Sequence, residues 1–478
     1  MPYKDHRDFF AALEREGELQ KIQEEVDWDV EVGAISRRNY ERYGPCLLFE
    51  NIKDYPKGYR ISNGTSGTWA RVAMALGLNK DASLREIYRA YEEGLAKKIP
   101  PTTIDKSVAP CKENIMLGDD VDLYQFPAPM VHEGDGGRYI GTWDCVICKD
   151  PETGWTNWGM YRFMVHTQNW LTGWPQYTSQ LAKIFRDHYL PHNKPMPIAI
   201  VLGADPVSHI VATAPLPLQE DEADYAGGMA GAPIELVRCE TSDLMVPANA
   251  EIVIEGELQP DKIAPDGPFG EYPGFRSGTM CEGVAVKVNA VTYRNDPIVT
   301  MICIGTPPDD SSIAASLSAA VSMKNGLKRR GVPVTEVYVP PEGVTHLIIV
   351  GVESGGPDIA RKVLDYFTAR RVMTNKHIVV GPDVDVFNMN EVLHAFATVC
   401  HPGRGIQYEW YEGRANSLTP FYSPDERRRL KGVSVVFDAT WPPDWSQEII
   451  PIKASFNEIY SKEIQDKVIT NWKHYGLE

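Results

Sequence analysis

The sequence has no long hydrophobic run and no export signal. Its longest apolar stretch, PIAIVLGA at 197–204, has the length of one buried strand and falls short of the roughly 18 residues that suggest a membrane span. The first residues, MPYKDHRDFFAALERE, are charged from the start and lack the apolar core of a signal peptide. We therefore expect a cytoplasmic protein that does not enter a membrane.

Cysteine is sparse and scattered, with eight residues in a chain of 478. This spacing is not a disulfide framework, and without an export signal it predicts reduced thiols. Cys145 and Cys148 form a CxxC pair in TWDCVICKD, but no second pair completes a zinc site. The pattern favours two residues of one strand over a zinc or redox site.

Motifs that mark several common enzyme classes are also absent. The sequence contains no GxSxG, no Walker A motif, no HExxH and no GxGxxG that opens a βαβ unit. These absences argue against serine acyl transfer, P-loop nucleotide hydrolysis, zinc-dependent hydrolysis and Rossmann-type dinucleotide binding. Only 48 Lys and Arg stand against 65 Asp and Glu, a formal charge of −17, which argues against nucleic-acid binding.

The chain is too long for one hydrophobic core, and its pattern changes along its length. Helix and strand patterns alternate over 1–114, with Asp5 as the N-cap of a first helix. Short β-type runs fill 115–310, which is typical of a barrel, and DPETGW predicts a hairpin. SSIAASLSAAVSMKNGLKRRG predicts a linker helix over 311–332, and strands and helices alternate again over 333–478, with FNEIYSKEIQDKVITNWKHYGL as a helical tail.

Two acids, Asp266 and Glu271, lie five residues apart in APDGPFGEYPG at 264–274. The three glycines and three prolines of this segment predict a stiff, irregular loop that is neither helix interior nor central strand. A plain surface turn has no need of the two aromatic residues that this loop also contains. We therefore expect the loop to hold its two carboxylates in a partly apolar setting.

Arg162 is the natural partner for these carboxylates. It lies among apolar residues in TNWGMYRFMVHT, and strand alternation places it on one face with Trp158, Met160 and Met164. A guanidinium on an apolar face is costly unless it is paired, which favours a buried carboxylate of the protein or of a substrate as its partner. The alternative is a barrel arginine whose charged head reaches water.

Asn157 lies five residues before Arg162, and an odd separation places two side chains on opposite faces of a regular strand. If both residues serve one site, the strand contains a bulge, which Gly159 could host, or it begins after 157. The acids of QEDEADYAGGMAG at 219–231 are typical of a solvated loop, but the Gly/Ala run beside them would allow one of them to bind a hard cation.

These residues resemble those of the UbiD family, reversible decarboxylases that use prenylated FMN. The resemblance runs from FFAALEREGELQKI through CETSDLMVPANAEIVIEGEL, DGPFGEYPG and VTYRND to NWKHYG. It implies an α+β or α/β multidomain fold. An N-terminal α/β lobe (1–114) and a C-terminal α/β dimerisation and oligomerisation domain (333–478) would flank a central split β-barrel (115–310), which resembles flavin reductases and binds the cofactor.

The activity implied by the resemblance is reversible, non-oxidative decarboxylation of an aromatic, heteroaromatic or α,β-unsaturated carboxylic acid through cycloaddition of cofactor to substrate. Loss of CO₂ from such an acid needs an electron sink that side chains cannot supply, so a cofactor must supply it. Arg162, Asp266 and Glu271 match the family's catalytic residues, with Glu271 as the proton donor. Many members have Glu where this chain has Asp266.

The resemblance also implies how the cofactor is held. A divalent cation, Mn²⁺ or Mg²⁺, would be bound by Asn157, Gln180 and Glu222, with K⁺ nearby and Lys376 at the cofactor phosphate. Gln180 is a departure, because the family has His at this position. The expected cofactor contacts are Asn157, Trp158, Met160, Arg162, Gln180, Glu222 and Lys376.

The expected substrate pocket is lined by Ala314, Asn416 and Leu418, and the small Ala and polar Asn favour a heteroaromatic or fused-ring acid over a simple acrylic acid. A UbiX-type flavin prenyltransferase would supply the cofactor, and the chain would form a homodimer or homohexamer. Two other functions stay open at this point. One is an FMN-dependent oxidoreductase on a split barrel, and the other is a non-catalytic subunit of a larger carboxylase complex.

Overall fold

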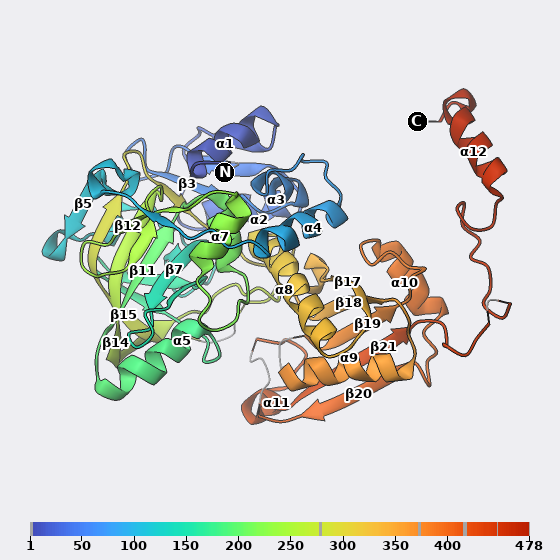
Figure 1. The fold of residues 1–478 in the computed structure, drawn as a ribbon. Helices are drawn as coiled ribbons and strands as arrows, with labels where there is room; N and C mark the ends of the chain where they lie inside the picture. The colour runs from blue at the N-terminus through green and yellow to red at the C-terminus, as the bar shows by residue number, and fades with distance from the viewer. Residues whose placement is uncertain (1–2, 277–279, 371–373, 414–417, 447, 478) are drawn as a thin grey trace.

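The computed structural model describes residues 3–276, 280–370, 374–413, 418–446 and 448–477. An N-terminal lobe and a central sheet domain form one body, and a long helix leads from it to a C-terminal α/β domain (Figure 1). The last segment leaves the C-terminal domain as an extended arm and ends in a helix that stands away from the rest of the chain (Figure 1).

The N-terminal lobe packs helices against a small sheet with strand order β1-β2-β3-β16. Its elements are α1 (His6–Arg15), β1 (Leu19–Ile22), α2 (Glu31–Tyr40), β2 (Cys46–Phe49), β3 (Arg60–Asn63), α3 (Trp69–Ala75), α4 (Leu84–Leu95) and β16 (Ile298–Thr300). The predicted cap of the first helix is confirmed, because Asp5 accepts the backbone N–H of Asp8 at 2.8 Å. The sheet is completed by β16, which follows the central domain in the chain and pairs in parallel with β3, so the two parts fold together.

The central domain is built on an antiparallel sheet. Its strands are β5 (Asn114–Leu117), β6 (Tyr139–Gly141), β7 (Asp144–Lys149), β8 (Thr156–Gly159), β9 (Phe163–Thr167), β10 (Trp170–Gly173), β11 (Met196–Leu202), β14 (Ile252–Asp266) and β15 (Cys281–Tyr293). They are ordered β6-β9-β10-β15-β14-β11-β7-β8, with β5 added to β15. One apolar cluster lies on one side of the sheet and extends into the N-terminal lobe, and another packs between the sheet and the helices α6 (Pro206–Ala212) and α7 (Glu222–Ala230).

Smaller elements complete the central domain. These are β4 (Thr102–Thr103), β12 (Glu235–Arg238) and β13 (Met245–Pro247), which form a short sheet of order β13-β12-β4, together with α5 (Gln180–Ile184) and short helical turns at Lys106–Val108, Pro110–Lys112, Gly118–Asp120, Leu123–Gln125, Phe185–Tyr189 and Leu190–His192.

The segment that carries Arg162 is not one strand, and the prediction that Arg162 shares a strand face with Trp158, Met160 and Met164 is wrong. β8 ends at Gly159 and pairs with β7, whereas β9 starts at Phe163 and pairs with β6 and β10. The break is held by Tyr161. Its backbone N–H donates to Asp144 Oδ1 at 3.2 Å, and its ring covers Gly159 so closely that a Cβ there would lie 2.7 Å from it.

This break shows that the central sheet is curled. β8 and β9 lie near opposite ends of the strand order, yet only residues 160–162 separate them. Four residue steps span at most about 14 Å, so the two ends of the sheet must approach each other. Arg162 therefore lies where the curled sheet brings its ends together.

The hairpin and cysteine predictions are confirmed. The DPETGW turn joins β7 to β8, with Lys149 opposite Thr156. Cys145 and Cys148 both lie on β7 as free, buried thiols, and they belong to the two different clusters on either side of the sheet. The CxxC pair is thus part of one strand.

The acid-bearing loop differs from its prediction in its first three residues. β14 extends through Asp266 and pairs with β15, so that Asp266 lies directly opposite Cys281. Pro265 is tolerated because β11 pairs with β14 only as far as Leu258, which leaves this end of β14 without a neighbour on its other side. Beyond Asp266 the loop is irregular, as predicted, and Gly267 has a positive φ of 77°.

The C-terminal domain follows the predicted long helix, α8 (Asp310–Arg329). Its sheet has the order β17-β18-β19-β21-β20, with the three central strands parallel. The elements are β17 (Val334–Tyr338), β18 (Leu347–Val352), α9 (Pro357–Arg370), β19 (Lys376–Val380), α10 (Met389–Thr398), β20 (Ile406–Tyr411), α11 (Pro424–Arg429), β21 (Gly432–Ala439) and α12 (Lys462–Asn471), with short helical turns at Pro341–Gly343 and Trp472–Tyr475. The alternation of strand and helix was predicted, but the terminal helix starts only at Lys462. No helix in the described ranges is long and apolar enough to span a bilayer.

Candidate active site

Arg162 binds both acids of the loop. Its Nε donates to Asp266 Oδ2 at 3.0 Å, its Nη2 contacts the same oxygen, and its Nη1 contacts Glu271 Oε1. The Asp266 side chain is fully buried, and the side chains of Arg162 and Glu271 are only 10% and 11% exposed. We call these three residues the acid–arginine cluster. The predicted buried partners of Arg162 are thus found, and the alternative of a guanidinium directed to water is excluded.

Two further side chains contact Asp266. The Tyr139 hydroxyl donates to Asp266 Oδ1 at 3.4 Å and accepts the backbone N–H of Gly267 at 3.1 Å. The Cys281 sulfur lies 3.6 Å from Asp266 Oδ2 and 3.9 Å from Nη2 of Arg162. Neither residue stands out in the sequence, although a position directly across the β14–β15 ladder from Asp266 is the signal that would have identified Cys281.

Aromatic rings enclose the guanidinium on two sides. The Arg162 Cζ atom lies 5.2 Å from the centre of the Trp174 ring and 5.3 Å from that of Phe269. Trp174 follows β10 directly, and Phe269 comes from the acid loop, which explains why that loop carries aromatic residues. The rings limit the access of water to the ion pairs, which strengthens their electrostatic interaction.

Burial governs the protonation of the acid–arginine cluster. Burial raises the pKa of Glu271, Arg162 opposes the rise, and the negative charges of Asp266 and Asp135 add to it. Burial also acts to lower the pKa of Arg162, but Glu271 and Asp266 outweigh it, and the result is a raised pKa. A permanently charged guanidinium thus lies beside a carboxyl group that holds its proton more tightly than an exposed Glu.

Asn157, Gln180 and Glu222 also come together, although they lie on different elements. The Asn157 Nδ2 atom is 2.6 Å from Gln180 Oε1 and 3.4 Å from Glu222 Oε1. Asn157 is on β8, Gln180 starts α5 and Glu222 starts α7. We call these three residues the amide–acid cluster. The strand contains neither the bulge at Gly159 nor the start after 157 that we expected, because Asn157 lies within β8 and that strand ends before Arg162.

The amide–acid cluster fits a hard divalent cation. Glu222 is buried and accepts the backbone N–H of Trp158 at 2.8 Å, but it forms no ion pair with a Lys or Arg of the described residues. Burial raises its pKa to about 8. No group of three His, Cys, Asp or Glu is gathered as a metal site in the part of the chain that the structure describes, so a cation here would rely on two amide oxygens and one carboxylate. Mn²⁺ and Mg²⁺ accept such oxygen donors.

Met160 and Ala314 belong to one small apolar cluster with Trp143, Ile302 and Ile304. Met160 follows β8 directly, and Ala314 lies in the first turns of α8, so this cluster connects the Arg162 segment to the predicted substrate position. The Trp158 side chain does not belong to this small apolar cluster. It packs in the cluster beneath α6 and α7, while its backbone N–H binds Glu222.

The C-terminal domain approaches the acid loop through aromatic residues. The rings of Tyr272 and His346 lie 6.4 Å apart, and those of His346 and Phe421 lie 5.9 Å apart. The Lys376 Nζ atom lies 4.1 Å from the centre of the Phe421 ring, and burial lowers its pKa. Leu418 is half-buried a few residues before Phe421, and Asn416 lies outside the described residues.

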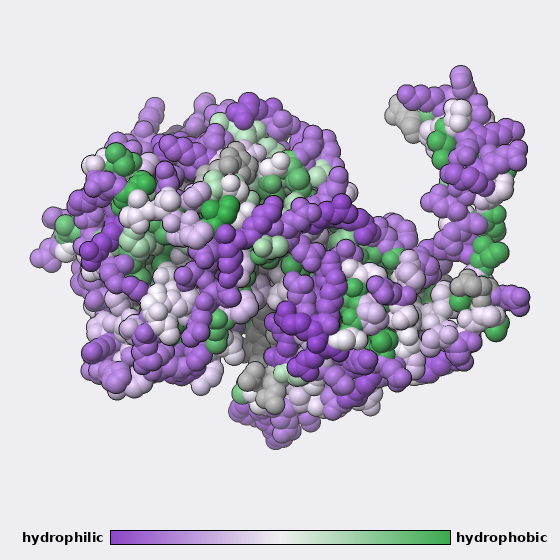
Figure 2. All heavy atoms as spheres, in the orientation of Figure 1, coloured by the Kyte–Doolittle hydropathy of each residue, from purple (hydrophilic) through white to green (hydrophobic). Residues whose placement is uncertain are grey.

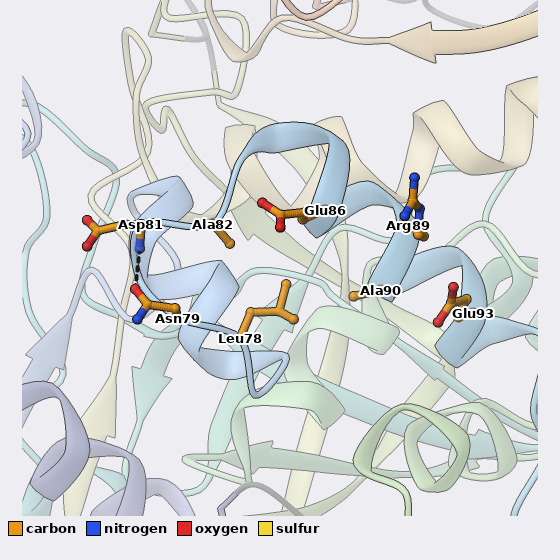
Figure 3. A pocket seen from close by; sticks show the side chains of 8 residues that line it. All are labelled: Leu78, Asn79, Asp81, Ala82, Glu86, Arg89, Ala90 and Glu93. Atoms are coloured by element: carbon orange, nitrogen blue, oxygen red, sulfur yellow. Dashed lines mark hydrogen bonds between the residues drawn. The ribbon is translucent and has the colours of Figure 1, made fainter. Parts of the chain in front are cut away.

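Two pockets lie away from these clusters. One of about 500 Å³ is formed by α4 and the loop before it (Figure 3). The other, of about 1210 Å³, lies in the C-terminal domain between α10 and the arm, and its lining includes Trp441, Trp445 and Ile452. None of the predicted site residues lines either pocket.

Comparison with known proteins assigns the family. Models described as the N-terminal, Rift-related and C-terminal domains of 3-octaprenyl-4-hydroxybenzoate carboxy-lyase match residues 10–91, 102–307 and 312–439. The chain belongs to the UbiD family. It is a UbiD-class carboxy-lyase, as the resemblance implied, and it has the mixed α/β, multidomain fold of that class, with a curled antiparallel half-barrel sheet at its centre.

Its relatives match over nearly their whole length. Pyrrole-2-carboxylic acid decarboxylase of Pseudomonas aeruginosa is 32% identical over 99% of this chain and 98% of its own. Ferulic acid decarboxylase 1 of Saccharomyces cerevisiae is also 32% identical, over 100% and 99%. Vanillic acid decarboxylase of Sedimentibacter hydroxybenzoicus in its closed form superposes with a TM-score of 0.87, at 27% identity over 98% and 99% of the chains. HmfF of Pelotomaculum thermopropionicum in complex with FMN superposes with a TM-score of 0.83, at 26% identity over 94% and 97%.

Proposed function

We propose that this UbiD-class carboxy-lyase catalyses the reversible, non-oxidative decarboxylation of an aromatic or heteroaromatic acid with prenylated FMN. The observation that carries the proposal is the buried contact of one guanidinium, Arg162, with two carboxyl groups, Asp266 and Glu271. A flavin oxidoreductase has no need of this cluster. When bound, prenylated FMN supplies the electron sink for CO₂ loss by cycloaddition to the substrate.

Each residue of the acid–arginine cluster has a separate task in this proposal. Glu271 holds a proton and donates it to the carbon that CO₂ has left, a task suited to a carboxyl group whose pKa is raised by burial. Asp266 binds Arg162 through two nitrogens and fixes its orientation. Arg162 then presents its positive charge to the substrate carboxylate in a setting that excludes most water.

The amide–acid cluster would hold Mn²⁺ or Mg²⁺ at the cofactor phosphate, with K⁺ nearby. Its fit rests on the buried Glu222, whose negative charge no described Lys or Arg compensates. Lys376 would add its charge to the phosphate from the C-terminal domain. Met160 would contact the cofactor from the segment between Asn157 and Arg162, and Trp158 would do so through its backbone, since its side chain packs beneath α6 and α7. HmfF in complex with prenylated FMN, 26% identical with a TM-score of 0.80, supports this choice of cofactor.

The substrate class follows from the relatives and from the small apolar cluster. The names of the relatives place pyrrole-2-carboxylate, ferulate and vanillate among the family's acids. Ala314 is a small residue in the same apolar cluster as Met160 and Trp143, and Leu418 and Asn416 would complete the pocket. We therefore favour a heteroaromatic or fused-ring acid, and reserve an α,β-unsaturated acid as the next choice.

We propose the domain division 1–114, 115–310, 311–332 and 333–478, with the central domain as a split barrel for the cofactor and the last as the oligomerisation domain. Apolar side chains exposed along the C-terminal arm support a homodimer or homohexamer, and they show as green patches in Figure 2. By exposed fraction, the apolar residues of the arm and its helix include Ile452, Phe456, Ile459, Ile464, Ile469 and Trp472. A second copy of the chain would cover them. HmfF has an evolved dimeric form.

The deciding experiment co-expresses the chain with a UbiX-type flavin prenyltransferase and tests a panel of acids for CO₂ release and for exchange with labelled CO₂. We expect turnover of a heteroaromatic acid only with the prenyltransferase, and its loss in Glu271→Gln with the cofactor spectrum retained. Turnover that depends on unmodified FMN and a reductant would overturn the proposal. A complete lack of activity in the lone chain that is restored by a partner subunit would indicate the accessory role.

A further inference from the structure

The turn formed by His132–Gly136 lies against the acid loop and has no role in the proposed chemistry. Both the backbone N–H and the Nδ1 atom of His132 lie 2.9 Å from Oδ2 of Asp135, whose side chain is fully buried. The His132 Nε2 atom lies 3.4 Å from the sulfur of Cys303. The imidazole ring is thus held at both nitrogens in one orientation.

The turn contacts the acid loop at successive residues. The Gly136 N–H donates to the carbonyl oxygen of Pro268 at 2.8 Å. The Phe269 ring meets the His132 ring edge to face at 5.7 Å. The His132 ring lies against Gly270, where a Cβ would lie 2.4 Å from Cε1 of His132 and within 2.9 Å of both ring nitrogens. Only glycine allows the loop to lie this close to the ring.

We propose that His132, held by Asp135, is a positioning residue that fixes the acid loop so that Glu271 reaches Arg162. Gly270 is bonded directly to Glu271. The His132 ring limits the position of the Gly270 backbone, and it therefore also fixes the position of the Glu271 Cα. A shift of about 1 Å at this point would misplace the proton donor, and shifts of that size can cost about 100-fold in rate. The inference rests on the proposed role of Glu271.

The charges around the turn are consistent with this role. Burial acts to lower the pKa of His132, but hydrogen bonds to Asp135 and Cys303 raise it to about 10, so the ring donates from both nitrogens at neutral pH. The charged groups that face Glu271 are Arg162 and Asp266, with Asp135 further away. Removal of the His132–Asp135 pair therefore changes both the position and the electrostatic surroundings of Glu271.

The test uses His132→Ala, His132→Asn and Gly270→Ala in the holoenzyme. His132→Ala should lower kcat by about 10- to 100-fold and leave KM within about threefold, because the loop positions the proton donor. His132→Asn retains a donor for Asp135 but not the ring beside Gly270, so it should recover only part of the loss. Gly270→Ala should be as damaging as His132→Ala, because its Cβ collides with the ring.

The double variant His132→Ala/Gly270→Ala separates positioning from a general structural role. With the ring gone, the methyl group added at position 270 occupies the vacated space, so the double variant should be more active than Gly270→Ala alone. If the double variant loses kcat by the product of the two single-variant losses, or if Gly270→Ala has a normal kcat, the inference is overturned. Gly403→Ala is a matched control, since its Cβ would meet the His401 ring at an ordinary 3.4 Å.

Two readouts keep this inference apart from the proposed function. Thermal unfolding and the absorption spectrum of bound cofactor show whether a variant folds and loads. If Glu271→Gln keeps full turnover, the proposed function fails whatever the His132 variants do. If Glu271→Gln is inactive but His132→Ala matches the unmodified protein in kcat and in the pH dependence of kcat, only the positioning role is lost.

Discussion

Arg162 binds Asp266 through two of its nitrogens, with Nε 3.0 Å from Oδ2, and keeps its third nitrogen for Glu271. This arrangement distinguishes the two acids. Asp266 is fully buried and binds the edge of the guanidinium that carries Nε, so it fixes the orientation of the guanidinium plane. Glu271 contacts one nitrogen at the tip and keeps 11% of its side chain accessible, whereas Asp266 keeps none.

Substitution of Arg162 by Lys should remove activity. An ammonium group is one point charge and cannot bind both carboxylates in the geometry of the guanidinium fork, so one buried acid is left unpaired. We expect kcat to fall by at least about 100-fold and the free energy of unfolding by about 3 kcal/mol. Steady-state kinetics and urea unfolding measure the two effects. Arg361→Lys is the control, since that arginine is exposed on α9. Equal losses in both variants would contradict the paired arrangement.

The pH dependence of kcat should follow the protonation of Glu271. Burial raises the pKa of this group, and a proton donor works only in its protonated form, so kcat should fall as the pH rises through that raised value. Stability should change in the same direction. Because the pKa in the folded protein exceeds that in the unfolded chain, the stabilising contribution is complete below the unfolded pKa and is lost as the pH rises through the folded one. Denaturant midpoints across this range should fall more steeply in the unmodified protein than in Glu271→Gln.

The sequence predicted the partners of Arg162 better than the strand that carries it. A guanidinium among apolar residues requires a carboxylate, and that requirement holds although Asp266 and Glu271 lie 104 and 109 residues further along the chain. Where β8 ends, by contrast, depends on Asp144, which accepts the Tyr161 N–H from another strand. No pattern within the segment contains that contact.

A similar limit applied to the acid loop and its surroundings. Proline and glycine correctly predicted an irregular loop beyond Asp266. They did not predict that β14 extends as far as Asp266, because that extension depends on where the pairing of β11 with β14 ends, at Leu258. Helices with clear caps, such as the first, were predicted closely. Tyr139 and His132 were not recognised as neighbours of the loop, since nothing in their own segment indicates which distant residues they meet.

Removal of the carboxylate from the amide–acid cluster should abolish the stabilisation of the protein by a bound divalent metal. Glu222→Gln removes a buried carboxyl group whose ionised form burial disfavours and keeps the shape of the side chain, so the metal-free variant should be at least as stable as the unmodified protein. Mn²⁺ should raise the Tm of the unmodified protein and leave that of Glu222→Gln almost unchanged. Differential scanning calorimetry with and without Mn²⁺ measures this, with Asp224→Asn as the control. An equal response of all three proteins to Mn²⁺ would place the metal elsewhere.

A charge at position 281 should damage the acid–arginine cluster without touching its members. Cys281 lies opposite Asp266 in the β14–β15 ladder, with its sulfur 3.6 Å from Oδ2. Cys281→Asp places a second negative charge at this distance, and like charges across a ladder destabilise it. We expect Tm to fall and kcat to drop by about tenfold or more, because Arg162 is drawn toward the new carboxylate. Cys281→Ser, which keeps size and polarity, should retain most of the activity, and an equal loss in both variants would point to the thiol itself.

The junction between the N-terminal lobe and α8 should depend on Asp310. This buried carboxylate accepts the Tyr40 hydroxyl and the backbone N–H groups of Gly64 and Ser66, with the Gly64 nitrogen at 3.1 Å. Asp310→Ala leaves these donors without their acceptor, at a cost of about 1–3 kcal/mol for each buried donor. Urea unfolding should show a loss of about 3 kcal/mol or more. Asp358→Ala, an exposed acid in the first turn of α9, is the matched control and should cost less than about 1 kcal/mol, because it loses only its interaction with the helix dipole.

Since α8 also carries Ala314, the Asp310 variant should lose substrate binding before it unfolds, which a rise in KM below the unfolding transition would reveal.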